Sequence, residues 1–266
     1  MSQIHSSALI SPKAEIAPNV HIGMGCIVEE GCRIGEGTEI RPHAIITGGT
    51  QIGSHNQIGY GAIIGAEPQD LAFKNVPSQV IIGDHNVLRE YVTIHRGTKE
   101  NTATKVGSHC YLMTGAHLAH NCQIGDRVIL VNNVLLAGYV EVHDGAFIGG
   151  GSAVHQFVRI GSQSIMRGQT RIGRDLPPFF MAVDTNQVSG INRVGLKRAG
   201  YSPDKRRNIQ CAYKLLYRSG CNVSQALELI EKNLQGEEID LLLNFIRSTK
   251  RGICMESRSL DPEREL

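Results

Sequence analysis

The segment AHLAHNC (116–122) places two histidines, His117 and His120, three residues apart in this 266-residue chain. A neutral imidazole can accept a proton from a hydroxyl group, because its ordinary pKa of about 6.5 leaves it mostly unprotonated at neutral pH. Gly138 and Gln156 follow His120 at successive intervals of 18 residues. A glycine beside the imidazole would leave space for a substrate, and its backbone N–H could stabilise an oxyanion. The pattern therefore predicts proton transfer at a site that also stabilises negative charge.

The 18-residue interval matters because an aliphatic residue recurs at every sixth position of the chain. The series runs in constant phase from Ile4 to Ile172, and 27 of its 29 positions are aliphatic or Met. A period of six matches neither a helix nor a simple strand pattern. Three six-residue faces would form one coil, and successive coils would stack as parallel strands about 4.8 Å apart. The repeat predicts a hexapeptide β-helix in which His120, Gly138 and Gln156 form one column.

Two polar residues, Asp70 and Glu100, interrupt the aliphatic series, and they lie in the polar segments 66–79 and 97–105. The series resumes in phase after each segment, so we expect both segments to be loops expelled from the coils. Loops on a rigid framework often carry binding residues. The Gln69–Asp70 pair is either a simple turn or a polar tip that reaches over a neighbouring subunit, since flat-faced solenoids commonly trimerise.

The repeat stops after Ile172, and the segment RDLPPFF (174–180) is a typical breaker of regular structure. From about Gln187 onward the pattern favours helices. Ser202–Pro203 predicts the start of a helix that ends near Gly220, and two further helices are expected at 224–234 and 237–249. We therefore predict two domains, a β-helix over 1–186 and a small α-helical C-terminal domain over 187–266.

Composition and charge exclude several classes of protein. The formal net charge of +2 is too small to favour nucleic acid or an anionic membrane surface. Seven cysteines without a CxxC spacing favour a reducing compartment over a disulfide framework. The sequence has neither a signal-peptide pattern at its start nor an apolar stretch of about 18 residues. We expect a cytoplasmic protein without membrane insertion and without bound nucleic acid.

Five segments resemble the UDP-N-acetylglucosamine O-acyltransferase family: IHRGT (94–98), AHLAHNC (116–122), AVHQF (153–157), NRVGLKRAGY (192–201) and AYKLLYRSG (212–220). The resemblance implies a left-handed parallel β-helix and a homotrimer with sites between subunits. It implies transfer of an (R)-3-hydroxyacyl group from acyl carrier protein to the 3-hydroxyl of UDP-N-acetylglucosamine, the first step of lipid A biosynthesis. It also implies no metal and no cofactor of the enzyme's own, since the acyl group arrives on the phosphopantetheine of acyl carrier protein.

The resemblance also assigns roles to individual residues. His120 would be the general base, the Gly138 N–H would stabilise the oxyanion, and Asn121 would orient the imidazole. The implied binding residues cover the sugar (Asp70, Lys74, His117, Tyr139), the acyl chain (Gln69 for its hydroxyl, Gly168 for its length), the nucleotide and acyl side (His155, Gln156) and the uridine diphosphate (Asn192, Arg198).

Several positions depart from the family pattern, and most of them concern the acceptor. The family often has Asp at Asn121, His at Tyr139, Lys at Ala72, Glu at Val194 and a second Arg at Ala199. Lys74, two residues after Ala72, is the nearest replacement for the missing lysine. An uncharged Asn orients an imidazole but adds no charge to stabilise its cation. A 3-amino sugar nucleotide or another acceptor therefore stays open.

Three alternative functions bear on the interpretation of the β-helix. A related hexapeptide N-acyltransferase would carry an additional N-terminal uridine-binding domain, whereas the repeat here begins at Ile4. A β-helix used as a scaffold would not need the two polar loops. A zinc-dependent hydratase on the same framework would need converging histidines, but residues three apart on a strand point to opposite faces unless a corner intervenes. The basic segment 197–218 is either a solvated helix face or a dock for acidic acyl carrier protein.

Overall fold

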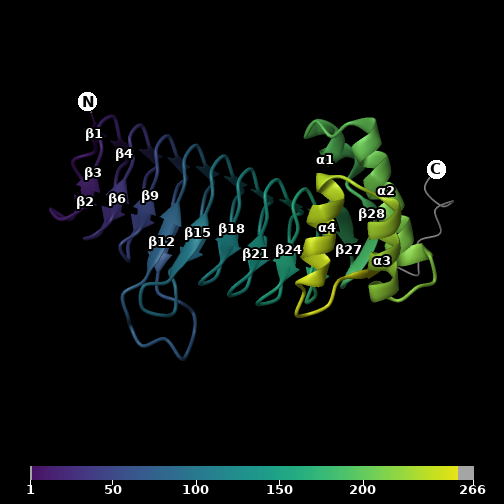
Figure 1. Ribbon diagram of the computed structural model, residues 1–266. Coiled ribbons are helices and arrows are strands. Elements are labelled where there is room, and N and C mark those ends of the chain that lie inside the picture. The colour runs from purple at the N-terminus through teal and green to yellow at the C-terminus, as the bar shows by residue number, and fades with distance from the viewer. Residues whose placement is uncertain (1, 257–266) are drawn as a thin grey trace.

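The computed structural model describes residues 2–256 and shows a left-handed parallel β-helix with helices at its C-terminal end (Figure 1). Three parallel sheets, here named A, B and C, form the faces of the prism. Sheet B contains β2 (Leu9–Ile10), β5 (Ile27–Val28), β8 (Ile45–Ile46), β11 (Ile63–Ala66), β14 (Thr93–His95), β17 (His117–Leu118), β20 (Leu135–Leu136), β23 (Ala153–Val154) and β26 (Arg171–Ile172). Sheet C contains β3 (Glu15–Ile16), β6 (Arg33–Ile34), β9 (Gln51–Ile52), β12 (Gln79–Ile82), β15 (Ala103–Val106), β18 (Gln123–Ile124), β21 (Glu141–Val142) and β24 (Arg159–Ile160).

Sheet A is the largest sheet, because three strands beyond the repeats join it. Its repeat strands are β1 (Gln3–Ile4), β4 (His21–Ile22), β7 (Glu39–Ile40), β10 (Gln57–Ile58), β13 (Val87–Leu88), β16 (Tyr111–Leu112), β19 (Ile129–Leu130), β22 (Phe147–Ile148) and β25 (Ile165–Met166). The additional strands are β27 (Phe180–Val183), β28 (Gln187–Ile191) and β29 (Met255–Glu256).

The predicted six-residue series forms the core of the prism. From Ile22 to Ile172, the second residue of each short repeat strand is buried, while the first faces outward and is more exposed. Aliphatic side chains suit this position because each buried methylene group contributes about 0.8 kcal/mol. Val76 is an exception, because it continues the series in the sequence but lies in a loop. It falls within the segment 66–79, which the sequence predicts to be an expelled loop.

The two expelled loops were predicted to within a few residues. The first leaves the coil after β11 and returns at β12, so it covers 67–78. The second leaves after β14 and returns at β15, so it covers 96–102, and residues 103–105 belong to a strand. Both loops hang from the same edge of the prism, beside β12 and β15 (Figure 1).

The C-terminal part contains four helices, α1 (Arg193–Arg198), α2 (Pro203–Arg218), α3 (Val223–Asn233) and α4 (Glu237–Arg247). The predicted start of α2 is confirmed, because the Ser202 side chain accepts a hydrogen bond from the Lys205 N–H. Helices α3 and α4 lie within about two residues of their predicted positions. None of the helices in the described part of the chain is long and apolar enough to span a bilayer.

The segment that begins at Gln187 forms a strand, whereas the sequence predicted helices from about this residue. Strand β28 begins there, pairs antiparallel with β27 and continues sheet A beyond the last coil. The QVSGI sequence of β28 is too short for its period to distinguish a strand from a helix. The division of the chain into domains at residue 186 stays a prediction.

A buried ion pair at the end of the prism contacts the C-terminal part of the chain. Asp175, with 1 % of its surface exposed, accepts hydrogen bonds from Arg159 Nε at 3.0 Å and Nη2 at 2.8 Å, and from Thr249 Oγ1 at 2.7 Å. The Arg159 guanidinium also lies over the ring of Phe245 in α4, 4.5 Å from its centroid. The helical part is therefore fixed to the prism through Thr249 and Phe245, which contact the two members of this ion pair.

Replacing this carboxylate tests how much the junction contributes to stability. Asp175→Ala leaves the Arg159 guanidinium without its partner, and we expect it to lower the free energy of unfolding by about 3–5 kcal/mol. Urea denaturation of the purified variant measures the change. Lys13→Ala, which removes the exposed Lys13–Glu30 pair, is the control and should not change the midpoint. An Asp175→Ala midpoint equal to that of the wild type would contradict the account of the junction.

Candidate active site

All turns that carry the predicted catalytic residues lie at one edge of the prism, where the chain passes from sheet B to sheet C. We call this edge the B/C corner. His120 lies between β17 and β18, Gly138 between β20 and β21, and Gln156 between β23 and β24. Both expelled loops leave the coils at the same corner, since each connects a strand of sheet B to a strand of sheet C. The predicted column is therefore confirmed as a structural feature, and the two loops flank one end of it.

Gly138 is in direct contact with the imidazole of His120. A Cβ atom at position 138 would lie 2.3 Å from His120 Cε1 and 2.6 Å from Nε2, so the ring occupies the space that any side chain would fill. The two turns are held in register by a hydrogen bond of 3.0 Å from the Tyr139 N–H to the His120 carbonyl oxygen. No hydrogen bond within residues 2–256 uses the Gly138 N–H, so this donor is available to a ligand.

Asn121 connects the imidazole to the second loop. Its Oδ1 lies 3.1 Å from His120 Nδ1 and 3.0 Å from both the backbone nitrogen and the hydroxyl of Thr98. The Asn121 N–H donates to Thr104 Oγ1 at 2.7 Å, and only 6 % of the residue is exposed. Thr98 belongs to the IHRGT motif, but the sequence pattern assigns it no role. The expelled loop was the available signal, but no period in the sequence predicts which side chain its backbone contacts.

A second imidazole, His117, faces outward from sheet B near the same corner. Burial, followed by the charge of nearby His95, lowers the pKa of His117 to about 4. Its Nδ1 lies 2.7 Å from the hydroxyl of Thr93, and the His95 ring packs edge-on against it at 5.2 Å. His95 is itself fixed by a hydrogen bond between its Nδ1 and the Glu67 carbonyl oxygen at the start of the first loop. At neutral pH His117 is therefore an uncharged hydrogen-bonding group.

The first loop is anchored by Arg96 of the IHRGT motif. The Arg96 guanidinium lies 3.2 Å from Asn75 Oδ1 and packs over the ring of Phe73 at 5.5 Å. Asp70 Oδ1 accepts a hydrogen bond of 2.9 Å from the Ala72 N–H, which makes a local turn of the kind that Asp favours. Gln69, Leu71 and Lys74 are exposed, and Leu71 is fully exposed. The loop thus presents polar groups and one apolar side chain away from its own prism.

Aromatic and basic side chains extend the site along the corner. The Tyr139 ring packs edge-on against His120 at 5.3 Å and stacks on Phe157 at 5.0 Å. Tyr139 and Phe157 also line a groove of about 780 Å³ that reaches Lys250 and Arg251. Arg251 Nη2 lies 3.3 Å from Nδ1 of the exposed His155, and Gln156 beside it is exposed. Sequence reasoning missed Lys250 and Arg251, because they lie far along the chain in a short tail without a motif.

Three predicted binding residues are not at the B/C corner of this chain. Gly168 lies between β25 and β26, at the opposite corner that joins sheets A and B. Asn192 caps helix α1, where its Oδ1 accepts from the Gly195 N–H at 3.0 Å and its Nδ2 donates to the Gln163 carbonyl oxygen at 2.8 Å. Arg198 is exposed in the last turn of the same helix. Their assigned roles stay predictions, and any role beside His120 requires a second copy of the chain.

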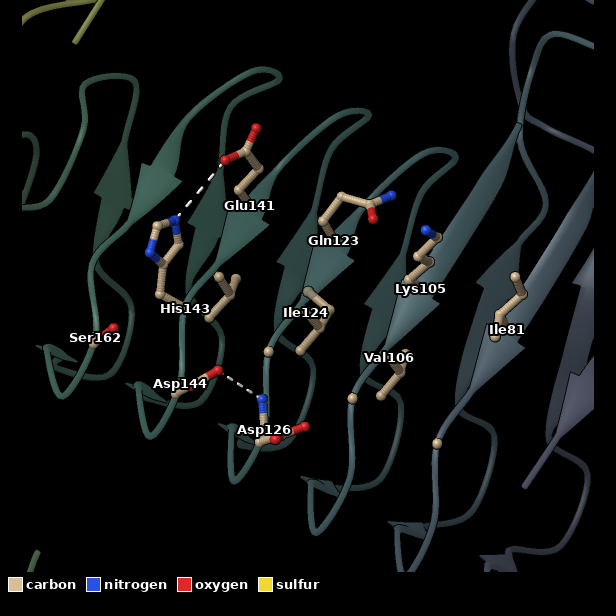
Figure 2. Close-up of a pocket in the computed structure, with 14 residues that line it drawn as sticks. Ile81, Lys105, Val106, Gln123, Ile124, Asp126, Glu141, His143, Asp144 and Ser162 are labelled. Atoms are coloured by element: carbon tan, nitrogen blue, oxygen red, sulfur yellow. Dashed lines mark hydrogen bonds and ion pairs between the residues drawn. The ribbon is translucent and has the colours of Figure 1, made fainter. Parts of the chain in front are cut away.

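A shallow pocket of about 540 Å³ on sheet C contains none of the predicted site residues (Figure 2). Figure 2 shows Lys105, Gln123 and Glu141 following one another along successive strands, with Glu141 Oε2 3.8 Å from His143 Nε2. Burial lowers the pKa of His143. In the described part of the chain, no three His, Cys, Asp or Glu side chains are grouped so that they could hold a metal ion.

Comparison with known proteins agrees with this geometry. Residues 175–254 match the family model for domain 2 of UDP-N-acetylglucosamine O-acyltransferase, and residues 31–66 and 103–138 match the bacterial transferase hexapeptide model. An acyl-carrier-protein–UDP-N-acetylglucosamine O-acyltransferase of Thermodesulfovibrio yellowstonii is 44% identical over 96% of this chain and 100% of its own length. The corresponding protein of Burkholderia lata is 40% identical over 95% of this chain and 99% of its own length.

Solved structures give the same result. The LpxA structure from Acinetobacter baumannii has a TM-score of 0.90 and 38% identity, and covers 94% of this chain and 98% of its own. The LpxA of Bacteroides fragilis, a UDP-N-acetylglucosamine acyltransferase, has a TM-score of 0.91 and 39% identity, and covers 94% of this chain and 99% of its own. On this evidence the chain belongs to the UDP-N-acetylglucosamine O-acyltransferase family.

Proposed function

We propose that this chain transfers an acyl group from an acyl carrier protein thioester to the 3-hydroxyl of UDP-N-acetylglucosamine, the first step of lipid A biosynthesis. The activity is that of its named relatives. The observation that carries the proposal for the site is the contact between the His120 imidazole and Gly138 at the B/C corner. It places a proton acceptor and an unused backbone N–H beside one another, which is what acyl transfer to a hydroxyl group requires.

The proposed reaction proceeds by direct attack of the sugar on the thioester. His120 Nε2 takes the proton of the sugar 3-hydroxyl group while the oxygen of that hydroxyl group forms a bond to the thioester carbonyl carbon. The Gly138 N–H stabilises the oxyanion of the tetrahedral intermediate. The intermediate collapses with cleavage of the carbon–sulfur bond, and the His120 imidazolium returns the proton to the leaving thiolate. General-base catalysis of this kind contributes a factor of about 10²–10⁴ to the rate.

A covalent acyl-enzyme on the cysteine beside the site is disfavoured. Cys122 lies two residues after His120, but it is fully buried and its thiol donates a hydrogen bond to the Ala137 carbonyl oxygen at 3.2 Å. Burial raises the pKa of Cys122 to about 12. Only the thiolate is an effective nucleophile, so this thiol is chemically inert at neutral pH. Its burial supports direct transfer to the sugar.

The outward faces of the prism support a homotrimer with sites between subunits. Apolar side chains face outward from sheet B and from the second half of sheet A, whereas sheet C is mostly polar. Leu135 on sheet B, beside His117, is 50% exposed, and Leu71 at the tip of the first loop is fully exposed. Packing sheet B of one copy against sheet A of the next would cover these residues. It would also bring the A/B corner of a neighbour, with its Gly168, toward the B/C corner.

We propose the cytoplasm as the location of the enzyme.

The basic segment of the C-terminal part is the proposed docking surface for acyl carrier protein. Part of the positive charge on α2 is neutralised, because Arg207 pairs with Asp204 at 3.0 Å and Lys205 with Glu237 at 3.3 Å. Lys197 and Arg198 on α1 are exposed, and no ion pair in the described part of the chain involves them. They are therefore available to an acidic partner.

A 3-amino UDP-sugar is the second candidate acceptor. The observation that favours it is the uncharged partner of the catalytic imidazole, since Asn121 stands where the family often has a carboxylate. Asn121 adds no charge to stabilise an imidazolium. A neutral amine is a stronger nucleophile than a hydroxyl group and needs less general-base assistance, so it would tolerate this change.

Product analysis tests the function and the role of His120 together. Purified protein is incubated with 3-hydroxyacyl carrier protein thioesters of several chain lengths and with UDP-N-acetylglucosamine or its 3-amino analogue, and products are identified by mass spectrometry. We expect a singly acylated UDP-sugar from the wild type, and at least a hundredfold lower kcat for His120→Ala with unchanged circular dichroism. Near-normal turnover by His120→Ala would remove His120 from the mechanism. No acylated sugar from any pair would refute the function.

Adding a methyl group at Gly138 tests the contact between the two turns. In Gly138→Ala the new Cβ would overlap the imidazole, so the ring must leave its position, and we expect kcat to fall at least tenfold. Gly173→Ala is the matched control, because its Cβ would meet no atom closer than 3.9 Å. Steady-state kinetics and thermal denaturation of both variants make the comparison. Equal activity of the two variants would show that the imidazole is not confined by Gly138.

A further inference from the structure

We infer that Thr98, in the loop 96–102, is a positioning residue that acts through Asn121 to fix which nitrogen of His120 carries the proton. The inference rests on the proposed function only in that it concerns the group proposed as general base. Nothing in the sequence repeat requires this loop, which leaves the coil directly after the strand β14 and returns at β15. Its hydrogen bonds to Asn121 connect the loop to the proposed general base.

The Thr98 backbone determines the orientation of the Asn121 amide. A backbone N–H can only donate a hydrogen bond. The Thr98 nitrogen lies 3.0 Å from one of the two terminal atoms of the Asn121 side-chain amide. That atom must therefore be the carbonyl oxygen Oδ1, so the ambiguity between the oxygen and nitrogen of an Asn side chain is removed. The same oxygen lies 3.1 Å from His120 Nδ1. An oxygen of this kind only accepts, so Nδ1 must carry the proton and Nε2 is left with its lone pair.

The Thr98 hydroxyl adds a second donor and extends the chain to Tyr139. Thr98 Oγ1 lies 3.0 Å from Asn121 Oδ1 and 3.0 Å from the Tyr139 hydroxyl. A threonine hydroxyl has one proton, and Oδ1 cannot donate, so that proton points to Asn121. The Tyr139 hydroxyl must then donate to Thr98. All hydrogen bonds of the chain Tyr139, Thr98, Asn121, His120 therefore have one possible direction while the imidazole is neutral.

The backbone of Asn121 is also held in place by hydrogen bonds. The Asn121 N–H donates to Thr104 Oγ1, whose hydroxyl donates to the His95 carbonyl oxygen at 2.6 Å. Asn121 is almost fully buried, with 6 % of its surface exposed. Three donors converge on one uncharged oxygen. A carboxylate at this position would accept the same three donors and would additionally favour the imidazolium.

Nitrogen NMR of the ligand-free protein tests the inference directly. The wild-type chain, labelled with ¹⁵N in its histidines, is compared with His120→Gln to assign the His120 signals at a pH where the imidazole is neutral. We expect a protonated Nδ1 and an unprotonated Nε2. A protonated Nε2 in the wild type would overturn the inference. Because no substrate is present, this result is independent of whether acyl transfer is ever detected.

Thr98→Val removes the hydroxyl donor but keeps the backbone N–H and the side-chain shape. Because the backbone N–H still fixes the Asn121 amide, we expect the wild-type tautomer of His120, but a less firmly held amide and a kcat about three- to tenfold lower, with KM little changed. Thr98→Ser should restore kcat and keep the tautomer. Thr38→Val, which removes a hydroxyl bonded to the Gly53 carbonyl oxygen at the corner between sheets C and A, is the control and should change neither. A Thr98→Val protein with the wild-type kcat, or a Thr98→Ser protein without it, would contradict a positioning role for the Thr98 hydroxyl.

Asn121→Asp provides a complementary readout. A carboxylate favours the protonated imidazole, so the acidic limb of the kcat/KM profile should move to higher pH. The Thr98→Val exchange should leave this limb nearly unchanged, because it removes no charge. An unshifted limb in Asn121→Asp would contradict the contact between position 121 and the imidazole.

Discussion

The register of the parallel coils is the constraint on which the active site depends. Each strand of sheet B pairs with the corresponding strand of the next coil, so Thr93, His117, Leu135 and Ala153 stand in one row. The turns that follow these strands are consequently stacked at the B/C corner. A single inserted residue in one turn would move the imidazole away from the glycine, whereas the two long loops are tolerated because both return the chain to the same register. The aliphatic core that maintains this register therefore also positions the site.

The groups proposed to catalyse the reaction at the B/C corner are fixed in position by different parts of the fold. The backbone ladder fixes Gly138 against the His120 ring, and the second loop fixes Asn121. The first loop is anchored by His95, the last residue of β14, and by Arg96, the first residue of the second loop. The position of β14 therefore determines the positions of both loops, and with them the groups that contact the imidazole and the proposed sugar substrate. This arrangement explains how a short motif such as IHRGT can matter for catalysis without contributing a catalytic residue itself.

Much of the fold could be predicted from the sequence, because the six-residue period is imposed directly by the inward-facing side chain of each short strand. The same period predicted that His120 and Gly138 would be adjacent. It could not predict β28, whose five residues carry too little pattern. Contacts made by loops, such as that between Thr98 and Asn121, depend on backbone paths that no periodicity describes. The roles assigned to Gly168, Asn192 and Arg198 came from resemblance alone, and one copy of the chain does not bring them to the corner.

A crystal structure of the protein with its acylated UDP-sugar product would test the central claim most directly, because the product marks the position of the reacting atoms. The account predicts that the acylated atom of the sugar lies within about 3 Å of His120 Nε2, and that the acyl carbonyl oxygen points to the Gly138 N–H. It also predicts that the product lies between sheet B of one copy and a neighbouring copy. A product bound in the shallow pocket on sheet C, or with its acylated atom far from His120, would contradict the account.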